Sequence, residues 1–361
     1  MDFEVRRSDL HQSRVVEEAP PDLAPGQALL RVDAFALTAN NVTYGVAGDA
    51  LKYWDFFPSH DREWGRIPVW GFADVVSTTH DGVADGTRVY GYLPMSTHLV
   101  VTPGRVEPLS FTDVAPRRAS LPGAYNQYQR LDADPTHDPA HDDYRMLLWP
   151  LFFTSFVIDD FLEDNAFFGA TTVIVSSASS KTAIGTAFQL EQRKTVDVVG
   201  LTSERNVGFV EGLGVYDRVV LYDDVDGLDQ TQSVYVDIAG DASVRSAVHR
   251  AFGDRLAYSM MVGATHWDEP AAAPVDLPGP APSFFFAPTQ ISKRSKDWGR
   301  AGLGDRVASA WGRFVEFCDG WVQIRHGHGP EAVEQTYLEV LEGRGDPTVG
   351  HILSMWPERA G

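Results

Sequence analysis

Residues 171–190 read TTVIVSSASSKTAIGTAFQL, and this stretch decides the fold class. An apolar β-branched run is followed by a short turn of small polar residues and then by apolar residues at helical spacing. A strand, a tight turn and a helix in this order form the layout of a dinucleotide-binding site, in which the helix N-terminus receives the diphosphate. Glycines usually line such a turn, whereas this one holds serines and a lysine.

The serine-rich turn either binds a cofactor or only caps the helix that follows. Small side chains still let a diphosphate approach the backbone, and hydroxyl groups add hydrogen-bond donors. Lys181 could pair with phosphate oxygens, and Gly185 is expected where the helix packs closely on a strand. The candidate cofactor residues of this turn are Ser177, Ser179, Ser180, Lys181 and Thr182.

Strands and helices alternate from this stretch onward. The predicted strands are TVDVVGLTS, RVVLYDD, SVYVDIAG and LAYSMMVGATHW, and the helices between them include ERNVGFVEGLG and SVRSAVHRAFG. This alternation predicts a doubly wound parallel sheet and the α/β class. Residues 1 to about 125 instead form short β-rich runs punctuated by Gly and Pro, which indicates a barrel-like or sandwich domain. We expect domains over residues 1–145 and 146–361, with the segment from about 285 to 361 able to pack back on the first.

The composition narrows the possible partners. The chain has 361 residues and a formal net charge of −20, with the acidic surplus spread along its length. This charge argues against a nucleic-acid partner, because phosphate binding needs clustered Lys and Arg. No apolar run reaches the roughly 20 residues of a membrane helix, and the start lacks a secretory signal, so we expect a cytoplasmic protein without a membrane partner. The single cysteine, Cys318, excludes a disulfide framework within the chain and a thiolate-rich zinc site.

The end of the second predicted strand indicates NADP rather than NAD. An acidic residue about 20 residues beyond the turn normally receives the ribose hydroxyls of NAD, whereas NADP sites hold groups that accept a phosphate. Here the strand is followed by Thr202, Ser203, Glu204 and Arg205. We predict NADP(H), with Thr202, Ser203 and Arg205 among its ligands, although Glu204 argues against this. The alternative is that Thr202 or Ser203 only caps the next helix and that Arg205 is solvated.

The chain resembles the medium-chain dehydrogenases and reductases, in particular their zinc-free quinone-oxidoreductase and enoyl-reductase branches. The stretches that carry the resemblance are ALLRVDAFALTANNVTYGVAGD, IPVWGFADVV, DGTRVYGY, THLVVTPGRV and VYVDIAGDASVRSAVHRAFGDRLAYSMMVGATHW. The serine-rich turn and FFFAPTQISKRSKDWG are similar to a bacterial branch with a serine-rich nucleotide turn. The resemblance implies a GroES-like β-barrel domain followed by a Rossmann nucleotide-binding domain, and a homodimer.

The chain departs from the zinc-dependent members of this superfamily. They carry a cysteine ligand where this chain has Asn40 and Asn41, and a His–Glu pair where it has Phe72 and Ala73. Their structural zinc loop needs four cysteines. We therefore expect a zinc-independent protein without a metal site.

The resemblance implies hydride transfer between a nicotinamide and an activated double bond or carbonyl. Matching positions place Tyr44 at the nicotinamide cleft as a hydrogen-bond donor or proton source, Asn41 near a substrate carbonyl, and Thr154 near the nicotinamide amide. Asp159 and Asp160 are adjacent on one helix, so at most one faces the cleft and the other should be solvated; Asp160 is the candidate. The alternatives are a packed aromatic for Tyr44, a turn residue for one asparagine, and a helix hydroxyl bonded to the backbone for Thr154.

Two later segments supply further candidate contacts. The ends of the last predicted strands border the nicotinamide, because an α/β sheet binds ligands at its carboxyl edge. The candidates there are Gly240, Gly263, Ala264 and His266. SKRSKDWGR concentrates basic residues, of which Lys293 and Arg294 could clamp NADP phosphates or an anionic substrate such as a carboxylate or an acyl-coenzyme A. A solvated loop is the alternative.

Three functions fit these observations. The first is an NADPH-dependent, zinc-independent oxidoreductase that transfers hydride to an activated alkene, quinone or ketone. The second is a catalytically silent NADP-binding protein, which the missing glycines and the lack of a strong acid–base pair keep open. The third is a cofactor-assisted lyase or isomerase.

Overall fold

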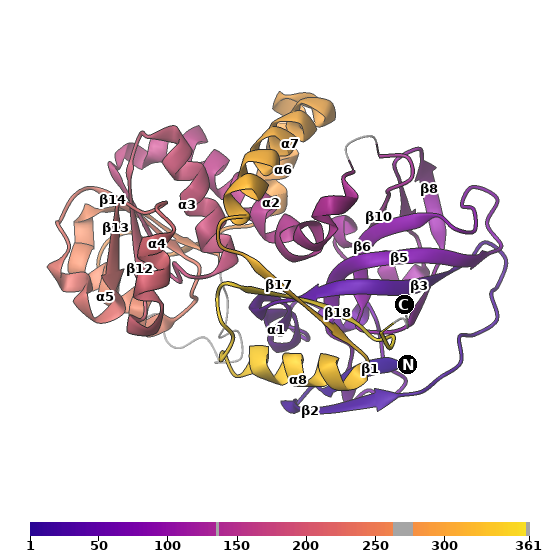
Figure 1. Ribbon diagram of the computed structural model, residues 1–361. Coiled ribbons are helices and arrows are strands. Elements are labelled where there is room, and N and C mark those ends of the chain that lie inside the picture. The colour runs from indigo at the N-terminus through magenta and orange to yellow at the C-terminus, as the bar shows by residue number, and fades with distance from the viewer. Residues whose placement is uncertain (135–136, 263–276, 359–361) are drawn as a thin grey trace. The chain divides into compact units, whose positions relative to one another are not determined.

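The computed structural model divides the chain into two compact units (Figure 1). The described residues are 1–134, 137–262 and 277–358. Unit 1 contains residues 1–147 and 323–361, and unit 2 contains residues 148–322. The segment that returns to the first unit is therefore shorter than the expected one, which began near residue 285.

In its described residues, unit 1 contains two sheets, two complete α-helices and the start of α2. Its strands are β1 (Asp2–Arg6), β2 (Asp9–Val16), β3 (Ala28–Leu37), β4 (Trp64–Gly65), β5 (Pro68–Thr78), β6 (Arg88–Pro94), β7 (His98–Val101), β8 (Pro103–Glu107), β9 (Ser110–Asp113), β10 (Gln127–Arg130), β17 (Gln323–His328) and β18 (Val349–Ser354). Its helices are α1 (Ala39–Val46) and α8 (Pro330–Leu341). One sheet has the order β2-β1-β4, and the other has the order β17-β18-β3-β5-β6-β10-β9-β8 with β7 also paired to β3.

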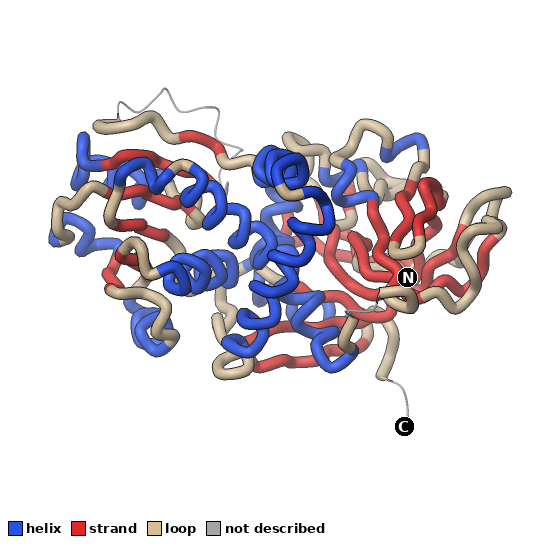
Figure 2. The backbone as a smooth tube through the Cα atoms, turned by 90° about the horizontal axis from the view of Figure 1, so that it is seen from above, coloured by secondary structure: helices blue, strands red, loops and turns tan. Residues whose placement is uncertain are grey.

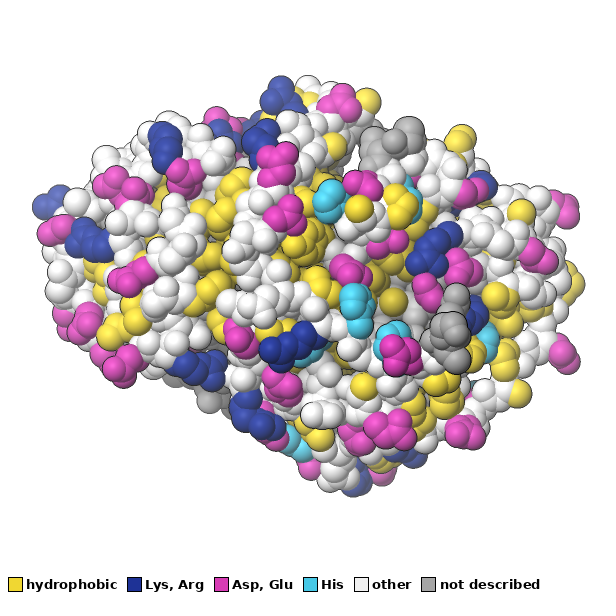
Figure 3. Space-filling model, viewed as in Figure 1, with side chains coloured by type: hydrophobic (Ala, Val, Ile, Leu, Met, Phe, Trp, Pro, Cys, Tyr) yellow, Lys and Arg dark blue, Asp and Glu magenta, His cyan; other side chains and the backbone are white. Residues whose placement is uncertain are grey.

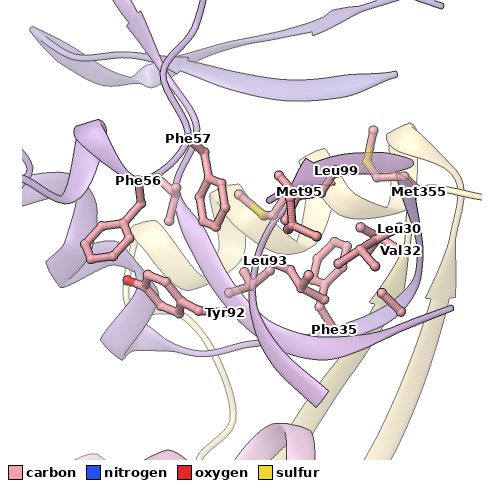
Figure 4. Packing of buried hydrophobic residues seen from close by; sticks show 14 of the residues in the cluster. Leu30, Val32, Phe35, Phe56, Phe57, Tyr92, Leu93, Met95, Leu99 and Met355 are labelled. Atoms are coloured by element: carbon pink, nitrogen blue, oxygen red, sulfur yellow. The ribbon is translucent and has the colours of Figure 1, made fainter. Parts of the chain in front are cut away.

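The core of unit 1 follows from the alternation of apolar residues along β3. Ala28, Leu30 and Val32 are buried, whereas the residues between them are less so, as expected for a strand with one face on a core. Figure 4 shows Leu30 and Val32 packed with Phe35 among the buried apolar side chains of this unit. The core therefore lies on the inner face of the larger sheet.

The C-terminal segment completes unit 1. Strand β18 pairs antiparallel with β3, with Ile352 opposite Ala36. From α8, the Tyr337 ring packs 5.3 Å from that of Phe3, and its hydroxyl donates to the Leu10 carbonyl at 2.8 Å. These contacts explain why the end of the chain returns to the first unit.

Unit 2 is built on a six-stranded parallel sheet. Its strands are β11 (Thr172–Val175), β12 (Asp197–Thr202), β13 (Arg218–Leu221), β14 (Ser233–Asp237), β15 (Leu256–Met261) and β16 (Ser283–Phe284). Its helices are most of α2 (Asp142–Asp164), α3 (Lys181–Arg193), α4 (Val207–Gly212), α5 (Ala242–Phe252), α6 (Ala287–Asp297) and α7 (Gly299–Cys318). Figure 2 shows helices on both sides of these strands.

The strand order β13-β12-β11-β14-β15-β16 decides the type of sheet. Numbered along the chain, it is 3-2-1-4-5-6, the order of the Rossmann dinucleotide-binding fold. All neighbouring strands are parallel. The order reverses between β11 and β14, and ligands of such sheets bind beyond the carboxyl ends of the strands at this point.

Three helices carry candidate site residues. Helix α2 begins at Asp142 with two acidic residues in its first turn and contains Pro150 in its interior. Residues 39–46 form helix α1, and residues 287–297 form helix α6, so the alternative of a solvated loop for the basic segment is wrong. Of the described residues, no helix is both long and apolar enough to cross a membrane.

Helix α7 is held in unit 2 by aromatic packing. The ring of Phe314 in α7 stacks on that of Phe152 in α2, with their centroids 4.8 Å apart, and packs edge-on against that of Phe188 in α3, with their centroids 5.4 Å apart. Cys318, at the end of α7, is buried, and burial raises the pKa of its thiol. On the face shown in Figure 3, acidic and basic side chains are interspersed.

Candidate functional site

The serine-rich turn lies at the carboxyl end of β11, where the strand order of unit 2 reverses. Ser177 has φ of 54°, in the left-handed region that glycine occupies without strain. Its amide donates to the Tyr222 hydroxyl at 3.1 Å, and the amide of Ala178 donates to the Leu201 carbonyl at 3.0 Å. Ser177 thus takes the backbone conformation of a turn glycine although it carries a side chain.

The next two hydroxyls of the turn are held by protein partners. Ser180 is the N-cap of α3, and its Oγ accepts from the amide of Ala183 at 3.3 Å. Ser179 Oγ accepts from Asn206 Nδ2 at 3.0 Å. The other amides of the first helical turn, up to Thr182, are the donors that a helix N-terminus offers to an anion. The plain capping role and the anion-binding role are therefore compatible in this turn.

Ser176 turns away from the helix N-terminus and into the sheet. Its buried Oγ donates at 3.1 Å to Oδ1 of Asp237, the last residue of β14. The same oxygen accepts from the amides of Ile238 and Ala239 at 3.0 Å. This side chain therefore leaves the space in front of the turn and joins the ends of the two strands that flank the switch point.

An ion pair between the half-buried Arg245 and the buried Asp237 continues this network. Asp237 Oδ2 accepts from Arg245 Nη1 of α5 at 2.8 Å, and Asp237 Oδ1 accepts from the amide of Gly240 at 2.9 Å. Gly240 has φ of 67°, so the turn after β14 requires the conformational freedom of glycine. The sequence interpretation missed Tyr222, Asp237 and Arg245. Only Asp237 carries a sequence pattern, an acidic residue that ends an apolar strand.

The end of β12 lies beside this turn through the Asn206–Ser179 hydrogen bond. Thr202 is 1% exposed and is the last residue of the strand. Ser203 precedes a short 3₁₀ turn (Glu204–Asn206) but makes no side-chain capping bond, so the capping alternative does not hold for Ser203. Arg205 is exposed.

The two adjacent aspartates of α2 are both buried, each 3% exposed. Asp159 accepts from Arg193 Nε at 2.7 Å and from its Nη2 at 2.8 Å, and burial raises the pKa of this carboxyl. Asp160 accepts from Arg294 Nε at 2.7 Å and from the Gln290 amide. The expectation that one of them is solvated is therefore wrong, because each has an arginine partner on a packed helix.

The basic segment forms ion pairs on helix α6. Lys293 Nζ lies 2.6 Å from Asp164 and 3.3 Å from Asp297. Arg294 contacts Asp160, Asp164 and Asp297, and its guanidinium lies over the Trp298 ring. These pairs tie α6 to α2 and favour a structural role for Asp160, Lys293 and Arg294.

The catalytic candidates of unit 1 lie on helix α1. Asn41 Oδ1 accepts from the amide of Thr38 at 2.8 Å, and Asn41 Nδ2 donates to the Pro68 carbonyl at 3.0 Å. Asn41 is thus used by the helix cap and by β5. Asn40 Nδ2 instead donates to the Tyr44 hydroxyl at 2.8 Å, and burial raises the pKa of that phenol.

Other candidates are placed as follows. Thr154 Oγ1 donates to the Pro150 carbonyl at 3.1 Å, which is the backbone bond of an ordinary helix hydroxyl. Gly263, Ala264 and His266 lie outside the described residues. Within the described ranges, no group of three or more His, Cys, Asp or Glu is arranged to hold a metal ion.

Known proteins match this chain in family and in fold. The model of the family described as "Protein of unknown function (DUF2855)" matches residues 35–346. The chain belongs to this family. No curated protein matches it.

Three solved structures illustrate the similarity in fold. CurA from Vibrio vulnificus in complex with NADPH is 13% identical, with a TM-score of 0.60 over 96% of this chain and 95% of CurA. The yhdH oxidoreductase from Salmonella enterica in complex with NADP is 15% identical, with a TM-score of 0.53 over 95% of each chain. Glucose dehydrogenase from Haloferax mediterranei, in complex with NADP, Zn and gluconolactone, is 11% identical, with a TM-score of 0.53 over 98% of each chain. The predicted fold, a GroES-like domain with a doubly wound parallel sheet, is confirmed.

Proposed function

We propose that the chain is an NADPH-dependent, zinc-independent oxidoreductase that transfers hydride to an activated alkene, quinone or ketone. The observation that carries this proposal is the position of the serine-rich turn. It joins β11 to α3 at the switch point of a sheet with Rossmann order, where such sheets bind dinucleotides. The similarity in fold to CurA and to the yhdH oxidoreductase, whose structures contain NADPH and NADP, supports the same cofactor.

The residues at this turn fit a dinucleotide. Ser177 adopts the conformation of a glycine, Ser176 turns into the sheet, and Ser179 is held by Asn206. A diphosphate can therefore meet the backbone at the α3 N-terminus, with Ser180, Lys181 and Thr182 as its neighbours. The small side chains here replace glycines without filling the approach to the helix.

The second strand supplies the groups for a 2′-phosphate. Ser203 is not used for capping, and Arg205 is exposed beside it. A hydroxyl and a guanidinium are the donors that a phosphate prefers, and Arg can bind it through two nitrogens. We assign the 2′-phosphate to Ser203 and Arg205, with the buried Thr202 supporting the strand end.

NADPH, when bound, supplies the hydride. The chain itself positions the cofactor and the substrate relative to each other and supplies a proton. Tyr44 is a neutral phenol held by Asn40, so it can donate a hydrogen bond or a proton to the oxygen on which charge develops. Asn41 and Thr154 are already hydrogen-bonded to backbone, so Tyr44 is the donor on which the proposal depends.

The proposal includes a homodimer and no metal. In the parallel sheet of unit 2, β16 is one of the two edge strands, and Phe286, two residues after it, is 54% exposed. An exposed edge of this kind can pair with a second copy of the chain.

Zinc-independence is tested by measuring activity in the presence of a metal chelator, which should leave the rate unchanged.

Calorimetric titration with NADPH and NADH tests the cofactor assignment. Arg205→Ala should weaken NADPH binding about tenfold or more and leave NADH binding nearly unchanged, because only NADPH carries the 2′-phosphate. Arg218→Ala is the matched control. Arg218 is an exposed arginine that pairs with Asp229, and it lies at the start of the neighbouring strand β13, at the opposite edge of the sheet from Arg205. Equal losses for both nucleotides would contradict the 2′-phosphate assignment.

A further inference from the structure

Unit 1 contains a cluster of seven aromatic side chains around Tyr92. We name it the aromatic nest, and its members are Tyr44, Tyr53, Phe56, Trp70, Tyr90, Tyr92 and Tyr125. The Tyr92 ring lies 4.7 Å from that of Tyr125, 5.2 Å from those of Phe56 and Trp70, and 5.6 Å from that of Tyr44. Figure 4 shows the Tyr92 hydroxyl on the side of Phe56 and away from Phe35.

The nest has a buried floor and a more exposed rim. Tyr90 and Tyr92, both on β6, and Phe56 are fully or almost fully buried. Tyr53 and Tyr125 are only partly buried, and their ring centroids lie 6.1 Å apart. The nest therefore joins the hydrophobic core on the side of Tyr92 and is more exposed on the side of Tyr53 and Tyr125.

Two hydrogen-bond donors of the nest lack a partner. Trp70 Nε1 and the Tyr92 hydroxyl are buried, and neither has a hydrogen-bond partner among the described residues. Two other hydroxyls of the nest have partners: Tyr90 donates to the Arg145 carbonyl at 3.2 Å, and Tyr44 accepts from Asn40 Nδ2 at 2.8 Å. Because an unpaired buried donor costs free energy, two of them side by side indicate a missing acceptor.

The nest is also uncharged. Two cations border it: the Arg118 guanidinium lies 5.3 Å from the Phe56 ring centroid, and the Arg145 guanidinium lies 5.3 Å from the Tyr90 ring centroid. Each is already paired with an aspartate, Arg118 with Asp113 at 3.3 Å and Arg145 with Asp134 at 3.4 Å. Burial raises the pKa of Tyr53 to about 12 and also raises the pKa of Tyr92, so these phenols are neutral donors at neutral pH. A carboxylate placed here would lose hydration without gaining a cation, which is unfavourable.

We infer that the aromatic nest binds an uncharged, planar aromatic carbonyl compound, whose ring lies among the aromatic side chains and whose oxygen accepts from Trp70 Nε1 and Tyr92. This inference rests on the proposed function, because it names the class of acceptor that the reductase would use. It excludes the carboxylate and acyl-coenzyme A substrates that the basic segment suggested. Rings that pack edge-on or offset on aromatic side chains gain more than burial alone provides.

Two enones that differ only in one group test this inference. 4-Phenyl-3-buten-2-one and 3-penten-2-one share the same carbonyl and double bond, but only the first carries an aromatic ring. Titration calorimetry with the full chain and saturating NADP⁺ should give at least about tenfold tighter binding of the phenyl compound, because its ring buries a Phe-sized apolar surface. Trp70→Phe and Tyr92→Phe should each weaken that binding about fivefold or more, since each removes one donor.

Trp64→Phe is the matched control, because Trp64 lies on β4 beneath Arg14 and should leave binding unchanged. Thermal unfolding of each variant separates loss of binding from loss of fold. Equal affinity for the two enones, no binding of the phenyl compound, or equal losses in all three variants would overturn the inference. If NADP⁺ does not bind, the titration without it still decides the inference, and only the proposed function fails.

Discussion

Ser177 holds a backbone conformation that costs an ordinary residue roughly 1–2 kcal/mol. The chain accepts this cost at the turn where a dinucleotide would approach. Local strain of this kind persists only where surrounding contacts fix it, and here Tyr222 and the Leu201 carbonyl hold the turn. The turn is therefore preorganised, although its sequence lacks glycine.

Ser177→Gly should raise the free energy of unfolding by up to about 1 kcal/mol, because glycine adopts the left-handed conformation without strain. Ser179→Gly should instead lower the free energy of unfolding by about 1 kcal/mol. This change removes the hydrogen bond that Asn206 Nδ2 donates to Ser179 and adds flexibility to the unfolded chain. Urea denaturation of both variants measures these changes. A destabilised Ser177→Gly variant would contradict the role assigned to the backbone of Ser177.

Tyr44→Phe should lower kcat by about tenfold or more and leave the affinity for NADPH unchanged. The change removes the hydroxyl that Asn40 holds and keeps the packed ring. Steady-state kinetics and NADPH titration on the same sample separate the two effects. Unaltered turnover would leave Tyr44 as a packing residue of the core.

Single residues show how much of the site the sequence could predict. The place of the turn was predictable, because strand and helix periodicity fix it locally. The direction of its side chains was not, because Ser176 bonds Asp237, 61 residues away, and Ser177 bonds Tyr222, 45 residues away. The same limit applies to the two asparagines, since only the fold shows that Asn41 bonds the helix cap and that Asn40 bonds Tyr44.

Between elements, the packing of α2 against α3 depends on Gly185. A Cβ at this position would lie 2.8 Å from Ser155 Oγ and 3.1 Å from Ser155 Cβ. Ser155 Oγ also donates to the Thr182 carbonyl at 2.8 Å, next to the candidate phosphate site. The sequence predicted a close contact at Gly185, but with a strand, whereas the neighbour is helix α2.

Gly185→Ala should lower the free energy of unfolding by about 1 kcal/mol, because overpacking outweighs the better helix propensity of alanine. Gly312→Ala in α7 is the control. Gly312 is exposed and has open space around it, so the same change there should stabilise by up to about 1 kcal/mol. Equal effects at both positions, measured by denaturation, would show that the contact with α2 is not tight.

Helix α5 and strand β15 are joined by a buried histidine. His249 Nδ1 lies 2.9 Å from the Pro278 carbonyl and must be the donor, so Nε2 accepts from the Ser259 hydroxyl at 2.9 Å. Burial lowers the pKa of His249 below its ordinary value. The neutral form is therefore the one that the folded chain prefers.

Stability should fall as the pH drops below about 6.5, because the unfolded chain takes up this proton before the folded chain does. His249→Gln cannot titrate, so its free energy of unfolding should change less between pH 7 and pH 5. Chemical denaturation across this range measures both slopes. Identical slopes in the two proteins would show that His249 does not contribute to the pH dependence.

For the whole molecule, the sequence predicted a β-rich part followed by a parallel sheet, because apolar periodicity and Gly and Pro positions mark such elements. It also predicted that a segment beginning near residue 285 could pack back on the first domain, but not that this segment begins only at residue 323 and adds β17, α8 and β18 to unit 1. The side chains of β17 are mostly exposed, so their pattern carries little of the alternation that identifies a strand. The residue contacts that bring this segment back, such as Tyr337 to Leu10, span more than three hundred positions.

The proposed function requires a dinucleotide site formed by serines at the switch point of unit 2. A crystal structure of the chain grown with NADP⁺ tests this site most directly. We expect the diphosphate to lie against the amides at the N-terminus of α3, with the 2′-phosphate beside Ser203 and Arg205. A structure in which the serine-rich turn is closed and NADP⁺ is absent from it, or bound elsewhere, would contradict the proposed site.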